Sequence, residues 1–119
     1  MSPTSRADPP RRGEVWWVAF DPSVGGEIQK TRPAVIVSND AANRHLNRLQ
    51  VVPVSSKMNR VFPSEAVIEL SGQRRKAIAD QLTTISKLRL RTPLGVLGAA
   101  DMAAVERAIL LQLGIGQGG

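Results

Sequence analysis

The chain has 119 residues, 42% hydrophobic and 22% charged, which is typical of one small globular domain and excludes a disordered or collagen-like chain. With no cysteine and a lone histidine, His45, it lacks the residues for disulfides, thiolate metal sites and cysteine nucleophiles, so we expect no metal, no cofactor and a reducing, cytoplasmic location. No apolar run reaches the ~20 residues of a membrane helix, and no secretory signal is recognisable. The formal net charge of +6 favours an anionic partner, most commonly nucleic acid.

The first third of the chain predicts two strands and a short helix. Residues 1–11 are rich in Pro, Ser and charge, which is typical of a disordered lead-in. A strand is expected at 14–20 (EVWWVAF), followed by a polar loop that runs to Thr31. The apolar run 33–37 (PAVIV) predicts a second strand that begins with proline. Residues 39–46 can form one or two helical turns, because they start with capping residues.

The remaining segments continue the all-β pattern and end in a helix. Short strands are expected at residues 50–54, 66–70, 77–79, 82–85 and 94–97. Within the first of these, Pro53 predicts a sheet edge or a bulge. From Met102 to Leu113 apolar residues recur every three or four positions, and Gly114 closes this helix. We therefore predict a mainly β fold, a small partly closed barrel of six or seven strands with a C-terminal helix. It forms a single domain at 12–114 with a flexible tail at 115–119.

The basic residues are concentrated in the second half of the domain. Residues 57–91 contain eight Lys and Arg but three Asp and Glu, which predicts one electropositive surface. A basic surface that serves only solubility is the alternative. The two Trp and two Phe are too few for a broad base-stacking platform, so a nucleic acid is expected to bind through phosphate contacts and hydrogen bonds. Trp16 and Trp17 point to opposite faces of one strand, but the spacing does not say which one faces the core.

Three polar groups beside the predicted strands are candidates for a functional site. Arg32 precedes a buried strand and can present its planar guanidinium to phosphate oxygens, unless it is a solvated loop residue or pairs with Glu27. Ser55 follows another strand with a hydroxyl that can donate to phosphate. The Asp80–Gln81 pair lies between apolar segments, where we expect it to be partly buried, although a structural hydrogen bond to a loop also accounts for it.

The chain resembles the MazF/PemK (Kid) family of toxin endoribonucleases from type II toxin–antitoxin systems over residues 12–113. The resemblance rests on three segments in the family's order: RRGEVWWVAFDPSVGGEIQKTRPAVIVSND, VVPVSSK and ADQLTTIS, followed by a final helix. It implies an SH3-like barrel that forms a homodimer and a cognate antitoxin that neutralises the toxin. It also implies metal-independent cleavage of single-stranded RNA, such as mRNA, at short preferred sequences, leaving 2′,3′-cyclic phosphate and 5′-hydroxyl ends.

The resemblance also assigns residues. The family's catalytic Arg and hydroxyl match Arg32 and Ser55, where many members have Thr, and its loop Glu matches Glu27. Asp80 matches a carboxylate that acts as the base in some relatives. Those relatives have an Arg at the position of Ile78, and this difference favours the Arg32/Ser55 scheme.

Contacts with RNA are expected from the basic loop and from the Asp-Gln pair, at Lys57, Arg60 and Gln81. The alternative function is a non-catalytic interaction protein of the same fold, either a gyrase-binding toxin or an inactive binder of RNA or antitoxin. The presence of both Arg32 and Ser55 favours cleavage, because a binder needs no such pair.

Overall fold

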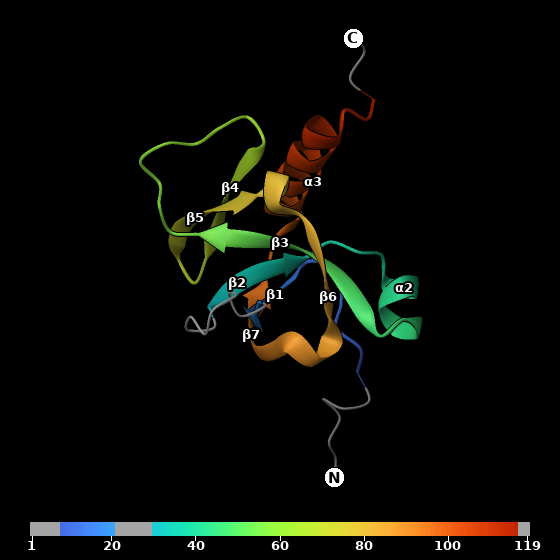
Figure 1. The fold of residues 1–119 in the computed structure, drawn as a ribbon. Coiled ribbons are helices and arrows are strands. Elements are labelled where there is room, and N and C mark those ends of the chain that lie inside the picture. The colour runs from blue at the N-terminus through green and yellow to red at the C-terminus, as the bar shows by residue number, and fades with distance from the viewer. Residues whose placement is uncertain (1–7, 21–29, 117–119) are drawn as a thin grey trace, which may run out of the picture.

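One strongly curved antiparallel sheet forms most of the molecule, and a long helix lies along its side (Figure 1). The structure is a computed structural model, and it describes residues 8–20 and 30–116. Neighbouring strands run in the order β4-β5-β3-β2-β1-β7, and β6 pairs with β3 off this path. The curved sheet confirms the prediction of a mainly β, partly closed barrel with a C-terminal helix.

Three strands form the middle of the sheet: β1 (Glu14–Ala19), β2 (Thr31–Ile36) and β3 (Arg48–Ser55). Their β-branched residues meet across the ladder, as in the pair of Val15 and Val35, both fully buried. β2 begins at Thr31, earlier than the apolar run alone predicts, so Arg32 belongs to the strand.

The prediction that Pro53 marks an edge or a bulge is wrong. Pro53 is buried within β3, pairs with Ala34 of β2, and lies in the middle of the sheet. On the other side of β3, β6 pairs up to Val51 and β5 pairs from Val54 onward. Proline is tolerated here because the ladder on that side is already interrupted where one partner strand gives way to the next.

The predicted helical turns are confirmed as α2 (Asp40–His45). The Asn39 side chain caps the helix by accepting a hydrogen bond from the Ala42 N–H at 2.8 Å. The buried Asn43 side chain donates to the Ser38 carbonyl at 2.9 Å and accepts from the Ser38 hydroxyl at 2.5 Å. These bonds satisfy the polar groups that α2 buries against the sheet.

The next two strands form a tight hairpin, β4 (Glu65–Leu70) and β5 (Gln73–Ile78). Its two turn residues, Ser71 and Gly72, have φ of 54° and 77°, which matches the twist of the paired strands. β5 starts at Gln73, four residues earlier than predicted. The prediction missed these residues because the QRRK stretch lacks the apolar alternation that indicates a strand.

The expected strand at 77–79 does not extend past Ile78: residues Ala79–Gln81 form the 3-10 helix η1. β6 (Thr83–Ser86), the 3-10 helix η2 (Lys87–Arg89) and the edge strand β7 (Leu90–Val96) follow.

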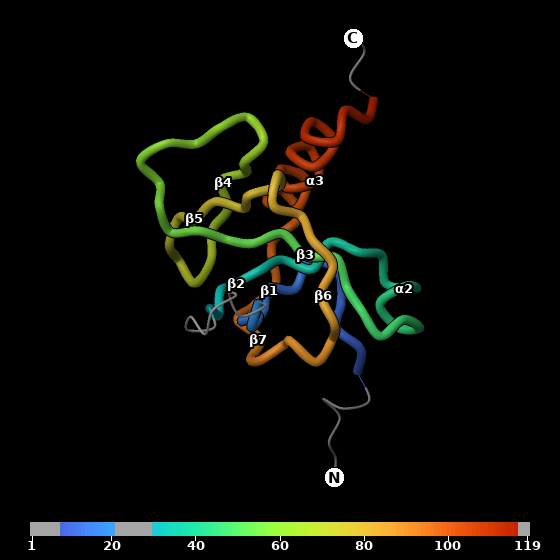
Figure 2. Tube along the Cα trace, in the orientation of Figure 1, coloured from blue at the N-terminus to red at the C-terminus, as the bar shows by residue number. Residues whose placement is uncertain are grey.

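The C-terminal helix α3 (Ala99–Leu113) contains the predicted apolar stripe from Met102 to Leu113. It ends as predicted at Gly114, whose φ of 72° is in the left-handed region that favours glycine. α3 packs along β4, and the Asp101 carboxylate accepts the Glu69 N–H at 2.9 Å. Figure 2 shows β3 running across the molecule from α2 to the loop before β4, below α3.

Two apolar clusters pack against opposite faces of the central strands. The first joins Val15, Val52 and Ile68 to Val105 and Ala108 of α3. The second surrounds Leu49, and Trp16 packs against it while its indole N–H donates to Glu14 Oε1 at 2.9 Å. Trp16 therefore faces the core, whereas Trp17 is 36% exposed.

Several predicted segments lie partly or wholly outside the described residues. These are the lead-in at 1–7, the part of the polar loop at 21–29 that contains Glu27, and the tail at 117–119. In the described part of the chain, no helix has both the length and the apolar character needed to cross a membrane.

Candidate functional site

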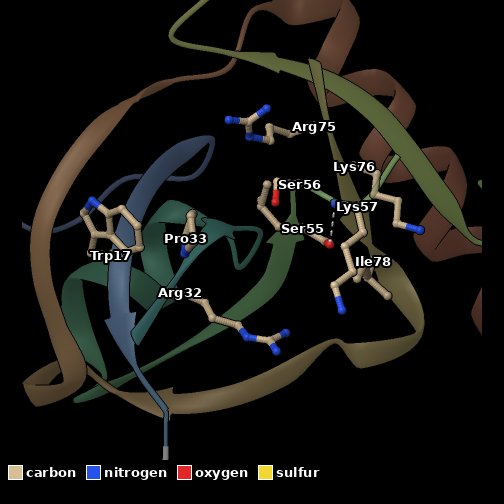
Figure 3. Close-up of a pocket in the computed structure, with 10 residues that line it drawn as sticks. Trp17, Arg32, Pro33, Ser55, Ser56, Lys57, Arg75, Lys76 and Ile78 are labelled. Carbon is tan, nitrogen blue, oxygen red and sulfur yellow. Dashed lines mark hydrogen bonds between the residues drawn. The ribbon is translucent and has the colours of Figure 1, made fainter. Parts of the chain in front are cut away.

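A hollow of 560 Å³ opens where β2 begins and β3 ends (Figure 3). Residues of four strands and of the segment after β3 line it: Trp17, Arg32, Pro33, Val54, Ser55, Ser56, Lys57, Arg75, Lys76 and Ile78. Both residues predicted to be catalytic, Arg32 and Ser55, are among them, as is one predicted RNA-binding residue, Lys57.

The register of the sheet explains why Arg32 and Ser55 line the same hollow. β2 and β3 are antiparallel, and their last paired residues are Ala34 and Pro53. Arg32 lies two residues before Ala34 and Ser55 two residues after Pro53, so both residues lie at the same end of the two strands. Since both residues lie at strand ends, their side chains are beside the opening rather than in the core.

The Ser55 hydroxyl is oriented by the chain that follows it. Its Oγ accepts a hydrogen bond from the Lys57 backbone N–H at 3.1 Å, drawn as a dashed line in Figure 3. A hydroxyl that accepts in this way still has its own O–H to donate. Ser55 can therefore donate a hydrogen bond to an oxygen placed in the hollow.

The four cations around the hollow differ in their partners. Arg32 is exposed, and among the described residues neither it nor the Lys57 amine has an ion pair or a side-chain hydrogen bond. Arg75 donates to the Gln73 side chain and to the Arg74 carbonyl. Lys76 is buried and paired with Glu65 at 3.1 Å. Arg32 and Lys57 are thus the two charges best placed to bind an anion.

Three other predicted residues do not line the hollow. Asp80 and Gln81 are in η1, and both are exposed, so the expectation that this pair is partly buried is wrong. The cause is local: the 3-10 turn replaces the strand that would have turned them toward the core. Arg60 lies in the loop before β4, with its guanidinium over the Phe62 ring at 5.5 Å from the centroid.

Sequence reasoning assigned neither Trp17 nor Arg75 to the site. Trp17 lines the hollow because it pairs with Pro33 across β1 and β2, and Figure 3 shows Pro33 between Trp17 and Ser55. Strand alternation indicates that the two tryptophans face opposite ways, but only packing decides which one is outside. Arg75 belongs to the basic stretch noted in the sequence. Because it is far from Arg32 along the chain, the sequence alone does not indicate that both residues line one hollow.

The chemistry of the hollow suits an anionic ligand. Two cations without an ion pair among the described residues, a hydroxyl donor and an exposed aromatic face line one opening. Within residues 8–20 and 30–116, no group of three His, Asp or Glu side chains is placed to hold a metal ion. The arrangement can bind a phosphodiester and stabilise negative charge that develops on its oxygens.

Comparison with known proteins agrees with this chemistry. Residues 11–113 match the family model described as PemK-like, MazF-like toxin of type II toxin–antitoxin systems. The chain is 39% identical over 112 residues to endoribonuclease MazF9 of Mycobacterium tuberculosis, covering 87% of this chain and 95% of the relative.

Solved structures are similar as well. An endoribonuclease from a mycobacterial species matches with a TM-score of 0.77 and 26% identity, covering 92% of this chain and 95% of the other. A mycobacterial endoribonuclease in complex with its cognate antitoxin matches with a TM-score of 0.73 and 28% identity, covering 88% of this chain and 95% of the other.

Proposed function

The chain belongs to the family of PemK-like, MazF-like toxins of type II toxin–antitoxin systems, and from this premise we propose that it is an endoribonuclease that cleaves single-stranded RNA at short preferred sequences. The observation that carries the proposal is an open, basic hollow lined by both Arg32 and Ser55, in which the Arg32 guanidinium has no ion pair among the described residues. A ribonuclease needs such a pair because RNA carries its own nucleophile, the 2′-hydroxyl. The protein therefore has to align that group and stabilise charge on the phosphate.

In the proposed reaction the 2′-oxygen attacks the adjacent phosphorus and the bond from phosphorus to the 5′-oxygen breaks. The products are a 2′,3′-cyclic phosphate and a 5′-hydroxyl, so no water and no metal ion is consumed in the step. The 2′-hydroxyl gives up one proton and the departing 5′-oxygen takes one up. Arg32 binds the non-bridging phosphate oxygens in a bidentate manner, and Ser55 donates a further hydrogen bond to them.

Arg32 is permanently charged and cannot accept the 2′-hydroxyl proton. Two carboxylates are candidates, Glu27 and Asp80. Asp80 does not line the hollow, so we propose Glu27, five residues before Arg32 in the sequence, as the acceptor. Glu27 lies outside the described residues.

The RNA is proposed to extend beyond the scissile phosphate over the surrounding surface. Lys57 is at the hollow, while Arg60 and Gln81 lie further out and contact neighbouring nucleotides. The exposed face of Trp17 offers a flat surface on which one base can stack. Because a relative has been solved with its cognate antitoxin, we also propose that an antitoxin neutralises this toxin, and that the toxin acts as a homodimer.

The experiment is to incubate the purified protein with an RNA oligonucleotide in excess EDTA and to analyse the product ends. We expect cleavage that leaves 2′,3′-cyclic phosphate and 5′-hydroxyl ends, and sequencing of the 5′ ends gives the preferred site. The Arg32→Ala variant serves as the control for a contaminating ribonuclease. RNA that is bound but stays intact would instead show a binding protein of the same fold.

A further inference from the structure

The basic hollow contains one cation that is not available to RNA. The Lys76 side chain is 9% exposed and forms an ion pair of 3.1 Å with the Glu65 carboxylate, which is also 9% exposed. Figure 3 shows Lys76 pointing away from Arg32 and out of the space that Ser55 faces. A buried ion pair requires both charges to lose their hydration, so it rarely adds stability over apolar residues of similar shape. Its presence beside the site calls for another role.

Both members of the pair also bind the backbone of one loop. Residues 56–64, the loop between β3 and β4, contain no helix or strand. The Lys76 amine donates to the Arg60 carbonyl at 2.7 Å, and the Glu65 carboxylate accepts the Phe62 N–H at 2.9 Å. The ion pair therefore connects β5 to the middle of the loop through two charge-assisted hydrogen bonds, which are stronger than neutral ones.

The loop carries two of the cations that are expected to contact RNA. Lys57 lines the hollow, and Arg60 lies over the Phe62 ring at 5.5 Å from its centroid. Arg60 and Phe62 are the two residues whose backbone groups the ion pair binds. Fixing the backbone at these positions reduces the entropy that the loop would otherwise lose on binding a ligand.

We propose that the Lys76–Glu65 ion pair positions the 56–64 loop for RNA binding: it fixes the backbone at Arg60 and Phe62, so that Arg60 is held ready for RNA that extends beyond the hollow, and it raises RNA affinity without touching the RNA. The proposal rests on the proposed function in one respect, namely that single-stranded RNA is the ligand of the hollow. The pair is a positioning device, and Lys76 is not one of the phosphate-binding groups.

The test replaces both members with apolar residues, as Lys76→Met with Glu65→Leu, since removing one member alone leaves a buried charge without its partner. The probe is a fluorescent single-stranded RNA with 2′-O-methyl groups, which this chemistry cannot cleave. We expect the Kd to rise about tenfold, because the released loop and its Arg60 side chain would have to become ordered when the RNA binds. Hydrogen exchange at the Phe62 amide should become faster in the same variant.

Two further variants separate positioning from general damage. Glu106→Gln removes the other ion pair of the described residues, Arg12–Glu106 at 2.7 Å, which is remote from the loop, and should leave the Kd unchanged. Lys76→Met with Glu65→Gln keeps an acceptor for the Phe62 N–H, so it should weaken binding less than the apolar pair does, and it carries the test if the apolar pair does not fold. Arg60→Ala should weaken binding in the wild-type background and add little once the ion pair is gone.

The proposal is overturned if a folded variant without the ion pair binds the RNA as tightly as wild type, or if Arg60→Ala has the same effect in both backgrounds. These outcomes are independent of cleavage. A protein that binds RNA through the positioned loop but does not cleave it would overturn the proposed function and leave this inference standing.

Discussion

Replacing Arg32 with alanine should abolish most RNA cleavage while leaving the fold intact. Arg32 is exposed, and its side chain has no ion pair or hydrogen bond within the described residues, so replacing the side chain breaks no such contact that holds β2 in the sheet. Surface substitutions of this kind change the free energy of unfolding by about 0.5 kcal/mol or less. For a domain of this size that corresponds to a shift in Tm of about 2–4 °C at most.

The effect on catalysis should be much larger. Removing one preorganised group that stabilises transition-state charge lowers kcat by about 10²–10³, or about 3–4 kcal/mol of activation free energy. Arg32→Lys should recover only part of this loss, because the ammonium group keeps the charge but cannot bind two phosphate oxygens in the same planar manner. The predicted signature is therefore a large loss of rate with almost no loss of stability.

The assay is single-turnover cleavage of a labelled RNA oligonucleotide, combined with thermal unfolding of each variant. The matched control is Arg44→Ala on α2, which removes an exposed arginine that does not line the hollow. Two results would refute the reasoning: cleavage by Arg32→Ala within about threefold of wild type, well short of the loss expected for such a group, or a fall in Tm large enough to show that Arg32 supports the fold.

Three further predictions concern the hydroxyl, an acid-sensitive contact and the assembly. Ser55→Thr should retain cleavage and Ser55→Ala should not, and equal loss in both would show that shape rather than the hydrogen bond matters there. The Arg12 backbone N–H donates to the Asp40 carboxylate at 2.8 Å and lowers the pKa of Asp40. This contact therefore stabilises the fold above about pH 4, and the stabilisation is lost as the pH falls through the lowered pKa. Urea unfolding of Asp40→Asn should accordingly depend less on pH in this acid range than that of wild type, and equal slopes would contradict it. Light scattering at micromolar concentration should give a dimer, because Leu110 and Leu113 of α3 are exposed and one side of β7 has no partner strand among the described residues. A monomer would exclude this assembly.

Local sequence patterns predicted most of the fold because the relevant physics is local. The β-branched runs of β1 and β2 and the Asn39 cap of α2 each follow from neighbouring residues. The boundary of α3 at Gly114 is equally local, since one glycine with positive φ ends the helix. Arg32 and Ser55 were candidates because each adjoins a recognisable apolar strand, and the family resemblance then assigned them the catalytic roles.

The remaining features depend on contacts between distant segments. From the sequence, Pro53 is typical of an edge strand. Its place inside the sheet is explained only by the structure, in which β3 pairs with β6 before Pro53 and with β5 after it. Asp80 looks like a buried strand residue until the chain turns into η1. The ion pair between Lys76 and Glu65 requires the β4–β5 hairpin, and no pattern in the basic stretch distinguishes Lys76 from Arg74 and Arg75.

The central claim is that the hollow cleaves RNA by using the substrate's own 2′-hydroxyl. The most direct test compares two oligonucleotides of the same preferred sequence, one all-ribose and one with a single 2′-deoxy sugar on the 5′ side of the scissile phosphate, both in EDTA. The account predicts that the first is cut to a 2′,3′-cyclic phosphate and that the second binds with similar affinity but stays intact at that position. Cleavage of the deoxy-substituted strand at the same bond would show that water or a protein side chain is the nucleophile, and would contradict the account.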